Sequence, residues 1–335
     1  MPTQQPGAFS WLQVFSGSEE MSRFYELIVM IAAYCVGIPL LLIYSRVVYV
    51  LIAHKKKFNS AFFQLVVVCG FMDCTQYVLS NFSNRLPRFG LVTEIYDLMD
   101  EPSTLYCVPF MLSNHLQLAS MLGSFILTLN RFTTVTVLSK NTEFRWRLAI
   151  PYMVGFLLIF PFIVMINFLF AECQYIKEIR YATFTYKVNV IQTLNLINYK
   201  LVMLLCGLIV SLPTFIFNVL TFVKLAQHHE KQGTKREIRE QYQLNLTIMT
   251  FMRFSTDLIF VAYSLTSYLL SSVGETSVLK NVHFYFYTLN DVISLTPGIV
   301  LFLGSRRVRE VVLGQWIWDY YTGARNNSTV IVMLA

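Results

Sequence analysis

The sequence predicts an all-α membrane protein built as a bundle of seven transmembrane helices. Hydrophobic residues make up 55% of its 335 positions and charged residues only 13%, against roughly 25% charged residues in an ordinary soluble domain. The longest apolar stretch, residues 105–138, exceeds the ~20 residues that a helix needs to cross a bilayer. No segment has the composition of a detachable soluble domain, so we expect one integral membrane domain.

Seven apolar spans follow one another between two polar ends of the chain. Residues 1–26 lack the basic region and the short apolar region of a cleaved signal peptide, so we expect the first span to act as its own insertion signal. Residues 305–335 form the C-terminal segment, and the transmembrane domain is expected over residues 27–304. Its spans are predicted near residues 27–53, 61–83, 105–138, 148–172, 196–226, 243–272 and 281–304.

An odd number of spans places the two ends of the chain on opposite sides of the membrane. The loops on one side hold 15 lysines and arginines, and those on the other side hold 7. Cytoplasmic loops are enriched in Lys and Arg, so the N-terminus is expected outside and the C-terminus in the cytoplasm. The net charge of +7 is concentrated in short loops between apolar spans. It therefore indicates membrane topology and not nucleic-acid binding.

After the last span, Ser305–Tyr321 is predicted to form an amphipathic helix on the membrane surface. Val308, Val312, Trp316 and Tyr320 recur every four residues, with charged residues toward the other side. A helix of this kind lies in the plane of the lipid interface instead of crossing it.

The third span is expected to be the central helix, and it ends on Asn130-Arg131-Phe132. An arginine at the end of an apolar helix has no low-cost position except a boundary between protein and water. Arg131 is therefore interpreted as part of the face offered to a cytoplasmic partner. The alternative is an anchor whose long side chain reaches the lipid headgroups.

Two cysteines are expected at the outer side of the membrane, where disulfides persist. Cys107 lies at the outer start of the third span, and Cys173 lies just past the outer end of the fourth. No other extracellular cysteine competes, so we expect a bridge that ties the second extracellular loop to the central helix. The alternative is a pair of free thiols near the interface.

Four ionisable residues fall near the middle of the predicted spans: Asp73, Arg253, Asp257 and Asp291. Such residues are costly in lipid and usually have a role. Arg253 and Asp257 are four residues apart, close enough to pair along one helix face. Asp73 and Asp291 are expected to share a hydrated polar cluster near the kink at Pro297. We expect these residues to serve helix packing or a conformational switch more than direct ligand contact.

The outer half of the bundle is the predicted ligand cavity. Aromatic rings with a few polar groups suit a small, largely apolar ligand. For each residue, packing inside the bundle is the alternative, and a lysine there can also reach the interface. The candidates are Asn114, His115, Gln117, Tyr199, Lys200, Tyr285 and Tyr287.

Four segments of the chain resemble one receptor family. The most specific is HKKKFNSAFFQL at His54–Leu65, and the others are GIPLLLIY at Gly37–Tyr44, LNRFTTV at Leu129–Val135 and NDVISLTPGIVLF at Asn290–Phe302. Together they are similar to the nematode serpentine chemoreceptors, most closely the Srg (serpentine receptor class gamma) family. The match runs over about residues 25–310.

The resemblance implies a G-protein-coupled receptor in the plasma membrane of a sensory neuron, at its cilium, that detects a small-molecule cue. Its partners would be the ligand, the lipid bilayer and a heterotrimeric G protein, and both a monomer and an oligomer are compatible with the sequence. Asn130 stands where rhodopsin-like receptors have an acid, so a receptor that no longer couples stays an alternative. The expected coupling residues are Asn130, Arg131, Lys235, Arg236 and Arg239.

Other classes of function have less support. The five histidines are scattered over both sides of the membrane and show no metal-binding spacing, so neither an enzyme nor a metal site is expected. Residues 281–304 contain no lysine for a retinal Schiff base, and no cofactor is expected. The main alternative is a channel or transporter that uses Asp73, Asp257 and Asp291.

Overall fold

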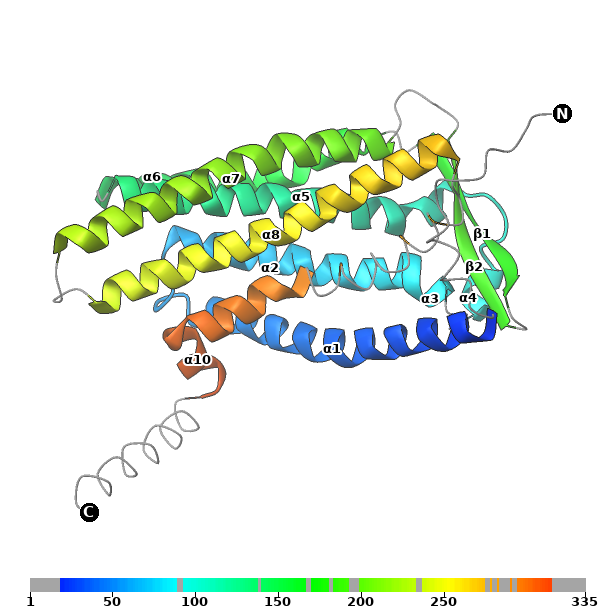
Figure 1. Ribbon diagram of the computed structural model, residues 1–335, viewed down its shortest axis with the longest axis horizontal. Helices are drawn as coiled ribbons and strands as arrows, with labels where there is room; N and C mark the ends of the chain where they lie inside the picture. The colour runs from blue at the N-terminus through cyan, green and yellow to red at the C-terminus, as the bar shows by residue number, and fades with distance from the viewer. Residues whose placement is uncertain are drawn as a thin grey trace, which may run out of the picture.

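The computed structural model describes residues 19–314 apart from 89–92, 138–139, 167–169, 181–182, 193–198, 233–236 and, but for 278, 282 and 290, residues 275–293. In this part of the chain, long helices form a bundle with a two-stranded sheet at one end (Figure 1). Six helices are long and apolar enough to cross a membrane, and a shorter apolar helix, Ser294–Gly304, follows them. The predicted all-α transmembrane bundle is confirmed, with the second half of its seventh span described.

Helices α1, α6, α7 and α8 extend past the predicted spans at one end, and α6 also ends before its predicted span does. Helix α6 ends at Val164, so the predicted end of the fourth span at residue 172 is wrong, because the chain there starts a β-hairpin. Of the predicted surface helix Ser305–Tyr321, α10 forms the first part, and residues 315–321 lie outside the described residues. The bounds are α1 Glu19–Ala53, α2 Ala61–Ser80, η2 Asn81–Arg85, α3 Leu86–Arg88, α4 Thr93–Asp97, α5 Thr104–Thr136, α6 Lys140–Val164, β1 Ala171–Arg180, β2 Thr183–Gln192, α7 Tyr199–Gln232, α8 Glu237–Val273 and α10 Arg306–Val312.

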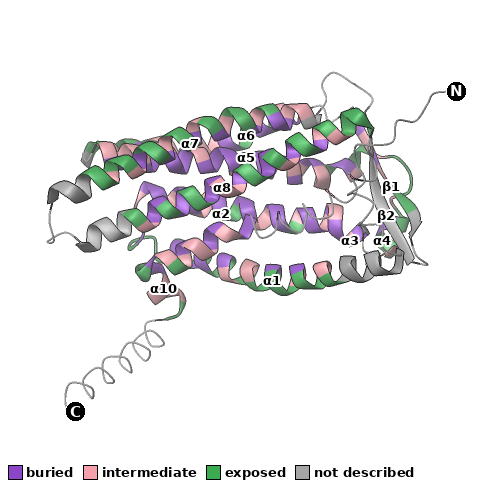
Figure 2. Cartoon of the chain, viewed as in Figure 1, coloured by how far each residue is buried: buried purple, intermediate pink, exposed green. Residues whose placement is uncertain are grey.

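Helix α5 is the centre of the bundle, as its long apolar sequence predicts. It packs against α2, α6, α7 and α8 and against strand β1, and buried side chains are concentrated on α2 and α5 (Figure 2). A small residue permits the close packing of α2 on α5, because a Cβ at Gly123 would lie only 2.6 Å from Cys69 Sγ. Small residues at such contacts are typical of helix pairs in membranes.

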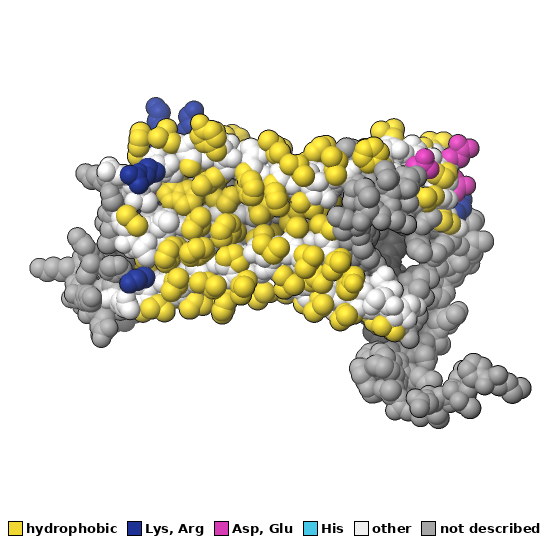
Figure 3. All heavy atoms as spheres, turned by 90° about the horizontal axis from the view of Figure 1, so that it is seen from above, with side chains coloured by type: hydrophobic (Ala, Val, Ile, Leu, Met, Phe, Trp, Pro, Cys, Tyr) yellow, Lys and Arg dark blue, Asp and Glu magenta, His cyan; other side chains and the backbone are white. Residues whose placement is uncertain are grey.

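The sides of the bundle are apolar, and its two ends are charged. Only 11% of the most apolar window of α6 is buried inside the bundle, and its exposed side chains include Tyr152, Phe156 and Ile159. The space-filling view shows hydrophobic side chains along the sides, lysines and arginines mainly at one end, and acidic residues at the other (Figure 3). This distribution places the basic end in the cytoplasm and the end with the β-hairpin outside.

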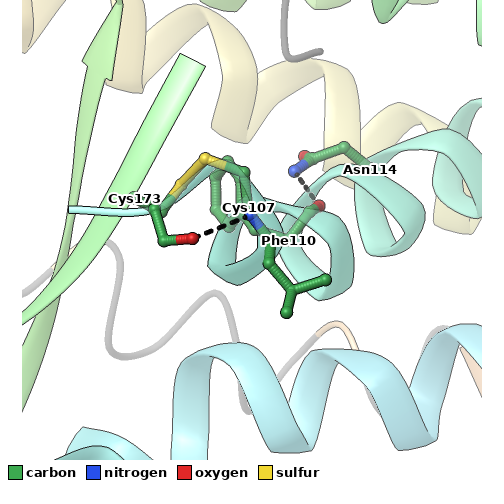
Figure 4. Close-up of a disulfide and its surroundings, with 6 residues drawn as sticks. Cys107, Phe110, Asn114 and Cys173 are labelled. Atoms are coloured by element: carbon green, nitrogen blue, oxygen red, sulfur yellow. Dashed lines mark hydrogen bonds between the residues drawn. A yellow bond between two sulfur atoms is a disulfide. The ribbon is translucent and has the colours of Figure 1, made fainter. Parts of the chain in front are cut away.

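A β-hairpin covers the outer end of α5. Strands β1 and β2 are antiparallel, with a register from Ala171 opposite Gln192 to Arg180 opposite Thr183. The structure joins Cys107 of α5 to Cys173 of β1 by a disulfide, the pairing expected from the sequence (Figure 4). The hairpin is therefore tied to the central helix by a covalent bond.

Further contacts hold β1 in this position. Ser103 and Cys173 exchange two backbone hydrogen bonds of 3.0 and 3.1 Å, and the Tyr175 N–H donates to the Met99 carbonyl at 3.0 Å. The rings of Tyr96 and Tyr175 lie 5.0 Å apart. Burial raises the pKa of Tyr175 to about 12, so its phenol stays protonated and uncharged at physiological pH.

Removal of the disulfide is predicted to destabilise the protein. The bridge closes a 66-residue loop, and a cross-link of that span contributes about 4 kcal/mol through the entropy of the unfolded chain. The double variant Cys107→Ala/Cys173→Ala should show less protein at the surface of expressing cells and a lower melting temperature in detergent. Cys206→Ala, which removes a free cysteine, is the control. Equal behaviour of the two variants would contradict a stabilising role for the bridge.

Candidate functional site

A buried ion pair joins Asp73 of α2 to Arg253 of α8 inside the bundle. Arg253 Nη1 donates to Asp73 Oδ2 at 2.8 Å, and Nη2 donates to Oδ1 at 3.0 Å. The two side chains are only 1% and 3% exposed. A guanidinium and a carboxylate in this two-point arrangement form one of the strongest polar contacts in proteins. Inside a membrane, each charge needs the other, because an unpaired buried ion is strongly destabilising.

Two hydroxyl groups complete the coordination of the carboxylate. Tyr44 of α1 donates to Asp73 Oδ2 at 2.8 Å, and Ser120 Oγ of α5 donates to Oδ1 at 2.6 Å. Ser120 also accepts from Arg253 Nη2 through its Oγ at 2.7 Å and its carbonyl at 3.3 Å. The network therefore links α1, α2, α5 and α8 through one buried carboxylate.

The ring of Tyr44 is held in place by close contacts with two glycines. A Cβ on Gly298 would lie 2.2 Å from Tyr44 Cδ2, and a Cβ on Gly70 would lie 3.0 Å from Cε2. Gly298 follows the buried Pro297 in the last apolar helix. That helix thus packs its backbone directly on the ring whose hydroxyl binds Asp73.

A second polar layer lies about one helical turn toward the outer end. Gln76 Nε2 of α2 donates to Gln117 Oε1 of α5 at 2.9 Å, and Ser294 Oγ of the last apolar helix donates to Gln76 Oε1 at 2.7 Å. All three side chains are buried. Gln76 therefore connects three helices, and Gln117, predicted as a ligand contact, is one of its two partners.

The predicted ligand residues on α5 face different neighbours and do not form one wall. Gln117 faces α2, and the His115 ring lies edge-on to Phe162 of α6 with 6.4 Å between ring centroids. Asn114 Nδ2 donates to the Phe110 carbonyl at 2.8 Å (Figure 4). The side chains of the remaining candidates lie outside the described residues: Tyr199, Lys200, Tyr285 and Tyr287.

The pairing expected between Arg253 and Asp257 is not the one that the structure forms. The guanidinium instead reaches Asp73 of α2, which offers it a two-point contact. An acid four residues after a base on one helix is also the less favourable order for pairing. Asp257 lies near Arg253 and is itself buried. The predicted cluster of Asp73 with Asp291 stays a prediction, since Asp291 lies outside the described residues.

At the inner end of α5, Arg131 is covered by an aromatic ring. Its guanidinium carbon lies 3.6 Å from the centroid of the Phe62 ring, which is a close cation–π contact. The side chain is 4% exposed, and the neighbouring Asn130 is also buried. The ring belongs to the loop string His54–Leu65, whose Phe58 takes part in the same aromatic cluster. In this conformation Arg131 is not offered to the cytoplasm.

The first cytoplasmic loop is clamped to α6. Glu143 Oε1 accepts from the Ala61 N–H at 2.8 Å and from Arg147 Nε at 3.1 Å. Arg147 also donates to the Asn59 carbonyl. These contacts fix the start of α2, and with it the Phe62 ring.

The predicted coupling residues of the third cytoplasmic loop are only partly placed. Arg239 lies in α8, but its side chain is outside the described residues, as are Lys235 and Arg236. Sequence reasoning did not identify Tyr44, Ser120 or Phe62, although each is the direct partner of a charged residue that it did identify.

The class of protein follows from these features. A multi-pass helical bundle with a lipid-facing apolar surface, a central third span and a cross-linked outer end has the architecture of a serpentine membrane protein. The model of the Srg family chemoreceptors matches residues 30–312, and the chain belongs to this family. A comparison with curated proteins finds no match.

Gly298→Ala is predicted to disrupt the network. The added methyl group would overlap the Tyr44 ring, and overpacking of a buried contact typically costs about 1–3 kcal/mol. We expect a clear loss of surface expression and of melting temperature. Gly155→Ala is the matched control, because a Cβ there meets nothing within 4 Å. Equal stability of the two variants would show that the Tyr44 ring is not held by this contact.

Proposed function

We propose that this chain is a chemosensory receptor that detects a small-molecule cue outside the cell and signals through a heterotrimeric G protein inside it. Its membership of the Srg chemoreceptor family supports the sensory role. The burial of Arg131 beneath Phe62 at the inner end of α5 supports the coupling role. We place the receptor in the plasma membrane of a sensory neuron, at the cilium, as its family resemblance suggests.

The closed inner end is interpreted as the resting state. Phe62 covers Arg131, and the ion pair of Asp73 with Arg253 holds α8 against α2 and α5. A ligand can shift the population toward another state only if it binds that state more tightly. In the proposed active state, α8 separates from α2 and α5, and the start of α2 moves away from α5 at the inner end. Arg131 is then exposed, with Lys235, Arg236 and Arg239 on the same side of the membrane.

Phe62 takes the place of the acid that Arg131 lacks beside it. Asn130 carries no charge and cannot pair with the guanidinium, whereas the face of an aromatic ring attracts a cation. The ring comes from another helix, so it leaves Arg131 when α2 and α5 move apart. An uncoupled receptor would have no need of this contact, and its presence supports a receptor that couples.

The ligand is proposed to bind between the outer hairpin and the polar layer of Gln76 and Gln117. His115 and Asn114 belong to the same region of α5. A ligand that contacts this layer would act on the ion pair of Asp73 about one turn away. Tyr199, Lys200, Tyr285 and Tyr287 are proposed as further contacts in this half of the bundle.

The direct test is ligand-dependent signalling in cells that express the receptor. Calcium or cAMP would be recorded during exposure to fractionated small-molecule extracts, with all variants at matched surface expression. Arg131→Ala should abolish the response, and Arg145→Ala, which removes an exposed arginine of α6, should preserve it. Ion flux in proteoliposomes without any acceleration of nucleotide exchange on a G protein would instead support a channel or transporter that uses Asp73, Asp257 and Asp291.

Phe62→Leu is predicted to raise signalling in the absence of ligand. A buried cation–π contact contributes about 2 kcal/mol, so its loss should increase basal nucleotide exchange by up to roughly thirtyfold. Phe62→Tyr keeps the ring face and should stay near the wild-type level. Phe63→Leu removes a neighbouring buried ring of the same size and is the control. If both leucine variants signalled alike, the effect would come from lost packing and not from Arg131.

A further inference from the structure

Arg253 has two carboxylates near it inside the bundle and binds only one of them. Asp73 accepts both of its Nη groups. Asp257 lies one turn further along α8, is 6% exposed and is close enough to Arg253 to interact electrostatically. Among the described residues, Arg253 Nε has no hydrogen-bond partner. In this conformation, the Nε–H of the guanidinium therefore makes no hydrogen bond within the described part of the chain.

The helix itself brings Asp257 within reach. Residues four apart lie on one helix face, with their Cβ atoms about 5–6 Å apart. Helical side chains lean toward the N-terminus, so the carboxylate of Asp257 leans toward the turn that carries Arg253. This neighbour stays beside Arg253 however α8 moves, whereas Asp73 belongs to a different helix.

Both charges keep partners if the guanidinium changes carboxylates. Without Asp257, separation of α8 from α2 would leave Arg253 unpaired in the bundle, which is strongly destabilising. With Asp257, the arginine has an acid on its own helix. Asp73 would retain the hydroxyl groups of Tyr44 and Ser120, which already donate to its two oxygens.

We propose that Asp257 is the alternative partner of Arg253. The guanidinium moves from Asp73 to Asp257 as α8 separates from α2 and α5, and a contact between helices becomes a contact within one helix. Asp73 is the preferred partner in this conformation, because it offers a two-point contact and Ser120 adds an acceptor. The role of this exchange in signalling rests on the proposed function, but the exchange itself does not.

A double-mutant cycle on thermal unfolding of the purified receptor tests the exchange. The variants are Asp73→Asn, Asp257→Asn and their combination. Each single variant should lower the melting temperature by only a few degrees, because Arg253 keeps one carboxylate. The double variant leaves it none and should unfold on the order of 10 °C below the sum of the single effects. Additive effects, within the error of the measurement, would overturn the proposal.

The same cycle in a receptor without Arg253 distinguishes the loss of this ion pair from a non-specific loss of stability. In receptors that carry Arg253→Met, the same two asparagine substitutions should be additive, because no guanidinium remains to exchange. Non-additivity that persists there would also overturn the proposal. If the double variant yields no folded receptor while both single variants do, that result is the expected non-additivity. If Asp73→Asn alone yields none, Asp257 is not a substitute partner.

Signalling measured on the same variants separates the exchange from the proposed function. Asp73→Asn should raise basal nucleotide exchange, and Asp257→Asn should reduce the response to ligand. An unchanged or lower basal exchange in Asp73→Asn, or an unchanged or larger response to ligand in Asp257→Asn, would overturn the role of the exchange in signalling. A receptor with the non-additive cycle but no coupling to any G protein would overturn the proposed function and still support the exchange.

Discussion

A guanidinium and a carboxylate that lie inside a membrane must stay paired, and this requirement organises the bundle. Asp73 and Arg253 come from helices that are far apart in the sequence, so their pairing fixes α2 and α8 relative to each other. Tyr44 and Ser120 bring α1 and α5 to the same carboxylate. Gly298 then seats the last apolar helix on the Tyr44 ring. Five helices thus depend on one buried charge pair.

The two ends of the bundle are held by different forces, and this difference indicates where the molecule can move. At the outer end, a disulfide joins α5 to the hairpin and backbone hydrogen bonds add to it. At the inner end, Arg131 is held by the face of the Phe62 ring and by side-chain contacts of the first loop. A covalent bond does not open on the time scale of signalling, whereas packing and ion-pair contacts do. Under the proposed function, the inner end is therefore the part of the bundle that moves.

The sequence predicted the spans, the disulfide and the charged residues, because each has a local signature. Apolar length identifies a helix that crosses lipid, and a charge such as Asp73 or Arg253 is conspicuous inside one. The partners Tyr44, Ser120 and Phe62 were not predicted, because they depend on how each helix is rotated about its axis. The hairpin of β1 and β2 was missed because the apolar run of the fourth span continues past Val164 up to Ala171, and the pairing of two strands has no comparable local signature.

The most direct test of this account is a charge exchange between α2 and α8. Asp73→Arg places two cations together, and Arg253→Asp places two carboxylates together, so each single variant should be nearly absent from the cell surface. The double variant restores one charge of each sign at the same contact. We predict that it recovers a substantial share of the wild-type surface expression. A double variant no better than the worse single variant would show that the bundle does not depend on this pair.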